Sequence, residues 1–530
     1  MCGIVSIWGH PNPDLVQTMM QRMRHRGPDA SGFYRVGKST VGHRRLSIMD
    51  PIGGNQPIFS ENGQSLIIAN GEIYNFSKLH SELVQRHTFS TVSDSEVVLH
   101  CFEDVGTNVA EHLDGMFAFV LTDGEEIYAA RDTVGIKPLY YGQVGNDIIF
   151  ASELKAFAGL VDNVHEFPPG AFYHSATGFQ TFSTLPTPAP QDMSVAEMCQ
   201  QIRETLEQAV IKRLMSDVPL GAFLSGGLDS SLIAAIARQH VDELHTFAVG
   251  FEGSSDLAAA RVVARHIDSI HHEYYLNYDE IVHDLPEILF YMESFDEDLV
   301  RSAVPNFYTA KLAAQYVKVV LTGEGADELF AGYRYFKSVA TDKLKHELHS
   351  ATSKLHNINL QRLDRLTMAH SIEGRVPFLD LEMIQLAQRI PAKWLIYPIQ
   401  NGKRVEKWIL RQAYEDLLPA EIVWRDKAQF SEGSGSTSML KPYTSSFMSD
   451  AEAEAYKEKY PTNRLRSLEE CVYHKLLCEA YDNPKVILDN VAHWSDQSSI
   501  KTWLKSQGEE AVSEMGADTL ISQSTGKSQD

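Results

Sequence analysis

The sequence predicts a two-domain α/β protein, with a strand-rich N-terminal half and a C-terminal half built around a parallel sheet. The chain has 530 residues, more than a single hydrophobic core usually serves. Short alternating apolar segments with Asp-Gly and Gly-Asn turns fill residues 1–180, and apolar strands alternate with helices after the proline-rich stretch STLPTPAPQDMS. We therefore expect domains over residues 1–185 and 195–505, followed by a polar, disordered tail over 506–530.

Composition and charge argue against several classes of protein. Hydrophobic residues make up 43% of the chain, and no apolar run approaches the roughly 18 residues of a membrane span. The formal net charge of −23 argues against a nucleic-acid or anionic membrane surface as the main partner. The 5 cysteines form no CxxC pair, so neither a disulfide framework nor a zinc site is indicated. Because the N-terminus lacks a signal-peptide pattern, we expect a cytoplasmic protein.

The N-terminal half is expected to contain layers of strands with helices outside. SLIIANGEIYN, MFAFVLTDGEEIYAARD and KPLYYGQVGNDIIFASE have the alternation and turns of strands and hairpins. Helices are expected around PDLVQTMMQRMRHR and at SDSEVVLHCFEDVG, where Ser93 and Glu96 have the spacing of a capping box.

The C-terminal half has the pattern of a parallel α/β sheet. The helical stretch CQQIRETLEQAVIKRLM precedes PLGAFLSGGLDSSLIAAIARQ, which reads as a strand, a glycine-rich turn and a helix. HTFAVGF and VKVVLTG are further strand candidates. Ligands of such sheets bind beyond the carboxyl ends of the strands.

The most unusual single residue is Cys2, because removal of Met1 would make it the N-terminus. A thiol needs a base at neutral pH, and a free α-amino group, with a pKa of roughly 7.7–8.0, can take its proton. Cys2 is therefore a candidate nucleophile that carries its own base. The alternative is an incidental small residue at the start of the chain.

Four further residues have properties that suit acyl transfer from an amino acid. Asn70 and the backbone of Gly71 could donate to an oxyanion, Arg45 could pair with a carboxylate, and Asp94 could bind an ammonium group. Taken singly, these are equally well a turn, a surface charge and a helix N-terminal acid.

Two loops of the second half suit a triphosphate. In SGGLDSS, the glycines and the hydroxyls of Ser225, Ser230 and Ser231 could cradle phosphate at a helix N-terminus. Asp229 there and Asp327 in LTGEGADELF could share Mg²⁺ with the ligand. The alternatives are an architectural glycine turn and a solvated acidic turn. No GxxxxGK[ST] motif is present, so a Walker-type loop is excluded.

The first 180 residues resemble the class II glutamine amidotransferase domain, which has the N-terminal nucleophile fold, an αββα sandwich. The resemblance rests on five stretches in order: MCGI at the start, RHRGPD at 24–29, RLSI at 45–48, NGEIYN at 70–75 and SDSE at 93–96. It implies that Cys2 attacks the amide of glutamine and releases ammonia, and that Asn70 and Gly71 form the oxyanion hole. It also implies a set of glutamine-binding residues: Arg45, Ile48, Met49, Asn70, Gly71, Glu72 and Asp94.

Over about residues 1–500 the chain is similar to the glutamine-hydrolysing asparagine synthetases, whose second domain is of the ATP-pyrophosphatase type. The shared stretches are SGGLDSS, TFAVGF, GSSDLAAAR, GEGADELFAGY, EGRVPFLD and WRDKAQFSEG. The resemblance implies that ATP and Mg²⁺ activate the β-carboxylate of aspartate as an acyl-adenylate, that ammonia displaces AMP, and that the protein is a homodimer.

The same resemblance implies roles in the second site. Glu324 is implied at the acyl-adenylate site as the acceptor of a proton from ammonia, Lys427 as a cation facing phosphate, Arg375 as an anchor for substrate, and Asp229 with Asp327 as metal ligands. The implied ATP and pyrophosphate residues are Leu224, Ser225, Gly226, Gly227, Asp229, Ser230, Ser231, Val249, Thr322 and Gly323.

One stretch departs from the family pattern. Residues 293–306 read ESFDEDLVRSAVPN, with Glu297 and Asp298 where family members carry threonines near the acceptor pocket. An amidotransferase that acts on a different carboxylate is therefore the second hypothesis. A non-catalytic storage or regulatory protein is the third hypothesis, and it is disfavoured because the sequence motifs of both active sites are complete.

Overall fold

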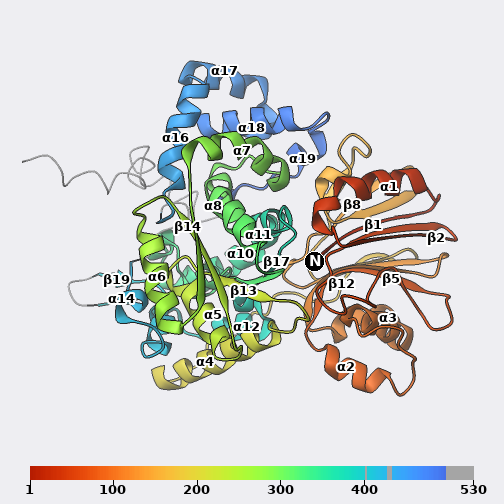
Figure 1. Ribbon diagram of the computed structural model, residues 1–530, viewed down its shortest axis with the longest axis horizontal. Coiled ribbons are helices and arrows are strands. Elements are labelled where there is room, and N and C mark those ends of the chain that lie inside the picture. The colour runs from red at the N-terminus through yellow and green to blue at the C-terminus, as the bar shows by residue number, and fades with distance from the viewer. Residues whose placement is uncertain (400–402, 427–432, 497–530) are drawn as a thin grey trace, which may run out of the picture.

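The computed structural model contains a domain of two stacked antiparallel sheets beside a larger domain with one parallel sheet (Figure 1). It describes residues 1–399, 403–426 and 433–496. Lys427 and the tail 506–530, both singled out in the sequence, lie outside these ranges. Within the described ranges, no helix is both long and apolar enough to cross a membrane.

Each N-terminal sheet has 6 strands. The first has the order β10-β8-β9-β1-β3-β2, with bounds β1 (Cys2–Trp8), β2 (Ala30–Val36), β3 (Ser39–Arg45), β8 (Tyr140–Val144), β9 (Asp147–Ala151) and β10 (Val164–Glu166). The second has the order β12-β11-β7-β6-β5-β4, with bounds β4 (Ile58–Phe59), β5 (Leu66–Ile73), β6 (Gly115–Thr122), β7 (Ile127–Arg131), β11 (Ala171–His174) and β12 (Gly178–Thr181).

The two sheets enclose one buried core and carry helices on their outer faces. Ile4, Val41, Ile68, Val120 and Phe150 belong to the cluster between the sheets. Outside lie α1 (Pro13–Arg22), α2 (Phe76–Leu83) and α3 (Asp94–Val105), with the short 3-10 helices η1 (Arg24–Arg26), η2 (Gly106–His112) and η3 (Leu154–Ala156) (Figure 1). The predicted αββα sandwich is confirmed.

The predicted capping box of α3 is wrong, although Ser93 is the N-cap. The Ser93 hydroxyl accepts from the N–H of Ser95. The Glu96 carboxylate accepts instead from the N–H and hydroxyl groups of Ser90 and Thr91, at 2.6–2.9 Å. Glu96 therefore stabilises the loop before the helix and does not cap the helix itself.

The second domain has a parallel sheet of 5 strands, as predicted. Its order is β15-β14-β13-β16-β17, with bounds β13 (Leu220–Phe223), β14 (His245–Gly250), β15 (Ile270–Tyr275), β16 (Val319–Leu321) and β17 (Glu373–Arg375). β18 (Tyr397–Pro398) and β19 (Arg404–Val405) form a small separate pair.

Helices surround this sheet. Those before residue 400 are α4 (Val195–Lys212), α5 (Leu228–Arg238), α6 (Ser255–Ile267), α7 (Tyr278–Met292), α8 (Glu297–Ala313), α9 (Ala326–Phe330), α10 (Thr341–Ser353), α11 (Asn359–Met368) and α12 (Leu381–Arg389). Later ones are α13 (Trp408–Ala413), α14 (Ala420–Val423), α16 (Ser436–Phe447), α17 (Asp450–Lys459), α18 (Leu468–Ala480) and α19 (Lys485–Asp489).

The domains are arranged so that the chain start lies between them (Figure 1). The Met1 side chain packs with Leu46 and Ile48 of its own domain and with Val319 and Met368 of the other. Residues 182–194 connect the domains without helix or strand, and α4 begins after a complete capping box of Ser194 and Glu197. The first candidate site is thus placed against the second domain.

Candidate active sites

The first site is built where β1 begins beside β5. Cys2 is buried and lies opposite Arg45 in the pairing of β1 with β3. Its backbone N–H donates to Asn70 Oδ1 over 2.8 Å. Asn70 Nδ2 is buried and has no hydrogen-bond partner among the described residues. A buried amide donor next to the thiol, with nothing to donate to, suits an oxyanion.

Gly71 allows the strand carrying Asn70 to pass close to its neighbour. It has φ +156°, and a Cβ there would lie 2.0 Å from the carbonyl oxygen of Met116. A side chain at this position would push β5 away from β6 and move Asn70 with it. Asn70 and Gly71 thus lie beside Cys2, as the sequence predicts.

The amino group of Met1 is buried beside Cys2. It forms an ion pair with Glu373 Oε2 at 3.1 Å. Burial raises the pKa of the Cys2 thiol, although the N-terminal ammonium and Arg45 oppose this. In the unprocessed chain the thiol is therefore held protonated, and Met1 occupies the space beside it.

Arg45 is held by the loop that follows β3. Its guanidinium donates to the carbonyls of Met49, at 3.0 Å, and Asp50, at 2.6 Å, and to Asn55 Oδ1 at 3.0 Å. These contacts fix the loop that contains Ile48 and Met49, the predicted backbone contacts of glutamine. Arg45 thus shapes the predicted glutamine pocket, and its donors are engaged within the protein.

Glu72 and Asp94 bring two buried carboxyl groups to the end of β5. Asp94 Oδ2 accepts from the N–H of Ile73 at 2.8 Å. Burial raises the pKa of Asp94 to about 6, and burial together with the charges of Glu373 and Asp94 raises that of Glu72 well above its usual value. A ligand ammonium placed between these carboxyl groups would favour their ionised forms, in addition to the charge that Arg375 already brings to Glu72.

The position of Arg375 corrects its predicted role as a substrate anchor. The side chain is fully buried, and within its own domain Nε donates to Glu373 at 2.6 Å and Nη1 to the carbonyl of Arg213 at 2.7 Å. Nη2 forms an ion pair with Glu72 at 3.3 Å. Because β17 turns this side chain toward the domain boundary, Arg375 does not line the cavity of the second domain.

The second site is a cavity at the carboxyl ends of β13, β14 and β16. Most of the nucleotide residues predicted from the sequence line it: Leu224, Ser225, Gly227, Asp229, Ser230, Val249, Thr322 and Gly323. Glu324 and Asp327 line it as well. Gly226 and Ser231 do not, because Ser231 is buried within α5 and Gly226 makes the turn at φ +71°.

The cavity has an apolar wall and a loop that is suited to bind phosphate. Phe223, Leu224, Phe247 and Val249 provide the apolar wall. The loop suited to phosphate lies before α5, and in it the Gly227 N–H donates to Ser225 Oγ at 3.3 Å. The cavity therefore offers an apolar wall to an aromatic base and a glycine-serine loop at a helix N-terminus to a polyphosphate chain.

A lysine missed by the sequence reasoning lies between the two predicted metal ligands. Lys407 Nζ lies 2.6 Å from Asp229 Oδ2 and 2.5 Å from Asp327 Oδ1, and the lysine is 1% exposed. The two carboxylates thus converge on one cation position, which is the arrangement that Mg²⁺ needs. The residues fit the predicted metal, with Lys407 as the cation in this structure.

One part of the cavity, near the segment predicted to bind the acceptor, contains charges from α8, α11 and the loop after β16. Arg362 Nη2 contacts Glu324 Oε1, and Arg362 Nη1 donates to Ser302 Oγ at 2.9 Å. Asp298 also lines the cavity and lies 3.5 Å from Arg301 Nη1. Burial, followed by Asp296 and Glu297, raises the pKa of Asp298 to about 7. Of these, only Glu324 was predicted as a site residue; Arg362 lies in no motif that the sequence offers.

A buried thiol beside an unpartnered amide donor in one domain, with a cavity at the carboxyl ends of a parallel sheet in the other, is the arrangement expected of a glutamine-dependent amidotransferase with a synthetase domain. The chain matches a glutamine amidotransferase family model over residues 1–190 and an asparagine synthase model over 201–343 and 337–505. It therefore belongs to the glutamine-hydrolysing asparagine synthetase family.

Plant asparagine synthetases are similar over most of the chain. Asparagine synthetase 2 of Oryza sativa subsp. japonica is 37% identical over 508 residues, which cover 91% of this chain and 85% of the relative. The enzyme of Triphysaria versicolor is 40% identical over 470 residues, covering 82% and 78%. Asparagine synthetase 1 of Arabidopsis thaliana is 36% identical over 512 residues, covering 91% and 86%.

An N-terminal extension is expected to abolish glutamine hydrolysis. Added residues that block removal of Met1 leave Cys2 without a free α-amine. They would also extend from a chain start that is buried against Glu373. We expect at least a 100-fold loss of glutamate release, measured with glutamine alone. The control is the same tag at the C-terminus. Full activity of a protein shown by mass spectrometry to retain the extension would contradict the assignment.

Replacement of Lys407 by Gln is expected to impair only the second site. The substitution removes the ammonium group that contacts both Asp229 and Asp327, and with it one of the cations lining the cavity, so binding of the nucleotide's phosphates weakens. We expect at least a tenfold loss in ATP-pyrophosphate exchange and unchanged glutamate release. Lys403→Gln, which removes an exposed pair with Asp426, is the matched control. Equal losses in the two variants would argue against the role.

Proposed function

We propose that this chain is an asparagine synthetase that hydrolyses glutamine at Cys2 and uses the ammonia to amidate aspartate with ATP. The observation that carries the proposal is the pairing of a buried Cys2–Asn70 site with a synthetase cavity in one chain. The family models and the names of the relatives support it.

In the first step, the Cys2 thiol attacks the side-chain amide carbon of glutamine. After Met1 is removed, the new α-amine takes the thiol proton, and Asn70 Nδ2 donates to the oxyanion. Loss of ammonia leaves a thioester, which water cleaves to glutamate. Glu72 and Asp94 hold the substrate ammonium.

In the second step, the cavity holds ATP and aspartate together. Ser225, Gly227 and Ser230 contact the phosphates, and bound Mg²⁺, held by Asp229 and Asp327, would supply charge neutralisation. The β-carboxylate attacks the α-phosphate, forming the acyl-adenylate and releasing pyrophosphate. Ammonia then displaces AMP, and Glu324 accepts the proton. Lys427 is proposed to face the phosphates.

The proposal also covers the location, the oligomeric state and the domain bounds of the protein. We propose a cytoplasmic homodimer, as the family resemblance implies. The proposed domains are 1–185 and 195–505. Light scattering coupled to size exclusion tests the dimer.

The decisive assay follows all products together. The chain is incubated with ATP, Mg²⁺, glutamine and aspartate, and equal amounts of asparagine, AMP and pyrophosphate are expected. Cys2→Ala should lose glutamine-dependent synthesis more than 100-fold yet retain synthesis from ammonium, because the second site needs only ammonia. Glutamate release without asparagine would point to another carboxylate acceptor.

Asp298 is expected to make aspartate binding dependent on pH. Its pKa of about 7 means that the carboxylate is charged only above neutrality, when it can bind the α-ammonium of the acceptor. The KM for aspartate should therefore fall several-fold between pH 6 and pH 8 in the ammonium-dependent reaction, extrapolated to saturating ammonia. Asp298→Asn should have a high KM at both values. Exposed Asp342→Asn is the control, and a parallel pH profile in Asp298→Asn would refute the assignment.

A further inference from the structure

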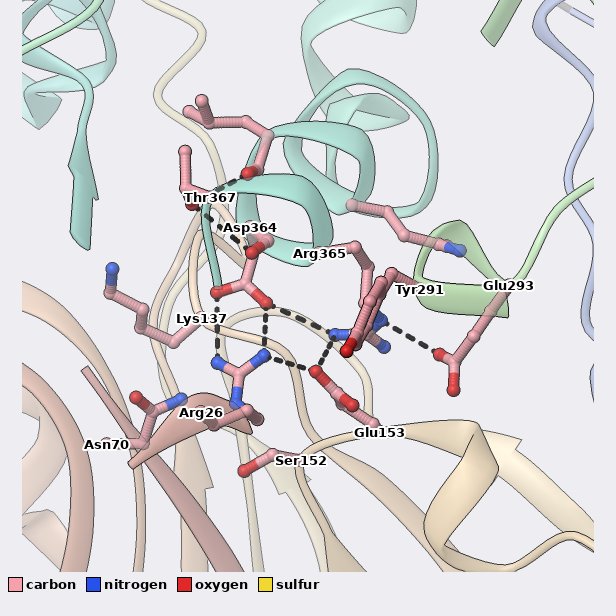
Figure 2. A network of polar contacts seen from close by, with 12 residues as sticks. Arg26, Asn70, Lys137, Ser152, Glu153, Tyr291, Glu293, Asp364, Arg365 and Thr367 are labelled. Atoms are coloured by element: carbon pink, nitrogen blue, oxygen red, sulfur yellow. Dashed lines mark hydrogen bonds and ion pairs between the residues drawn. The ribbon is translucent and has the colours of Figure 1, made fainter. Parts of the chain in front are cut away.

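A buried network of charges crosses the domain boundary (Figure 2). It reaches the backbone of Cys2 through Arg26. Its members from the first domain are Arg26, Glu153 and Lys155, and those from the second are Glu293, Asp364 and Arg365. All are at most 4% exposed. Three cations thus face three carboxylates, and His25 approaches Glu153 Oε2 at 3.0 Å.

Arg26 connects this network to the nucleophile. Its Nε donates to the carbonyl oxygen of Cys2 at 2.9 Å. Its two terminal nitrogens donate to Asp364, Nη1 to Oδ2 at 2.6 Å and Nη2 to Oδ1 at 3.1 Å, and Nη1 also reaches Glu153 at 2.7 Å. The guanidinium plane therefore fixes Cys2 relative to Asp364, because a bidentate pair allows little rotation.

Asp364 lies on the helix that also lines the synthetase cavity. Two residues earlier on α11, Arg362 contacts Glu324 and Ser302 inside that cavity. Every residue of α11 is buried, so the helix can move only as a unit with its surroundings. A shift of α11 on binding in the cavity would therefore also shift Asp364.

Arg365 provides a second connection from the same helix. Its Nε donates to Glu293 at 2.8 Å, and Glu293 accepts from the backbone N–H groups of Leu154 and Lys155 (Figure 2). Glu293 follows α7 and precedes the segment that carries Asp298. Both α11 and the start of α8, which line the part of the cavity near the segment predicted to bind the acceptor, are thus tied to the first domain.

We propose that this network couples the two active sites, with Asp364 as the positioning residue that transmits the state of the synthetase cavity to Cys2. Glutamine in the first site and nucleotide in the second then alter each other's affinity. The proposal rests on the proposed function, since it assigns these ligands to the two sites. By linkage, the two affinity changes must be equal.

The test measures this coupling by calorimetry in a Cys2→Ala background, where glutamine binds but is not consumed. The probe is α,β-methylene-ATP with Mg²⁺ and aspartate, titrated with and without saturating glutamine. We expect glutamine to tighten the analogue at least fivefold in Cys2→Ala, and less than twofold after addition of Asp364→Asn. Lys318→Gln is the control, because it breaks an exposed pair with Asp29 across the same boundary.

The outcomes are distinguishable. The coupling is overturned, and the function left intact, if glutamine tightens the analogue equally with and without Asp364→Asn. It is also overturned if glutamine does not change the affinity for the analogue in Cys2→Ala. Failure of both ligands to bind overturns the proposed function as well. If Asp364→Asn does not fold, Arg26→Lys replaces it, since lysine keeps the charge but cannot donate to Cys2 and to both Asp364 oxygens. Ammonium-dependent synthesis, measured with Cys2 present, should stay within twofold in either variant.

Discussion

Before Met1 is removed, the buried carboxylate of Glu373 is the contact that joins β17 of the second domain to the start of the chain. It meets the N-terminal ammonium at 3.1 Å and Arg375 Nε at 2.6 Å. Burial opposes its ionisation, yet these two cations lower the pKa of Glu373 to about 2. Removal of one partner from a buried pair typically costs about 3–5 kcal/mol, so β17 and the chain start are held together strongly.

This contact explains why both sites lie near one boundary. Arg375, which pairs with Glu373, also forms an ion pair with Glu72 of β5. The residues that precede Glu72 on β5 are Gly71 and Asn70. On the other side, the Thr322 N–H donates to the carbonyl of Arg375 at 2.9 Å, which places the loop with Glu324 beside β17. Asn70, the proposed oxyanion donor, and Glu324, the proposed proton acceptor, are therefore both positioned by contacts with the short strand β17.

The parts of the sites that the sequence could predict are those determined locally. Cys2 is unusual by position alone, and SGGLDSS is a strand-to-helix turn whose ligand end follows from the parallel sheet. Lys407 and Arg362 could not be found in this way. Arg362 reaches the cavity from α11 and Lys407 from the turn before α13, and no spacing rule relates these distant positions to Asp229 or Glu324. Arg375 was misassigned because a motif names a residue but not the direction of its side chain.

The distribution of charge explains how an acidic protein can hold a triphosphate. The chain carries a formal net charge of −23, yet Arg362, Lys407, Arg411 and Arg425 all line the synthetase cavity. Lys407 is already paired with two aspartates, and Arg362 with Glu324, so the positive charge is held in place by carboxylates before any ligand arrives. Six carboxyl groups line the same cavity: Asp229, Asp256, Asp298, Glu324, Asp327 and Asp426. A phosphate that enters therefore meets oriented cations but also a larger number of carboxyl groups, whose repulsion bound Mg²⁺ would offset.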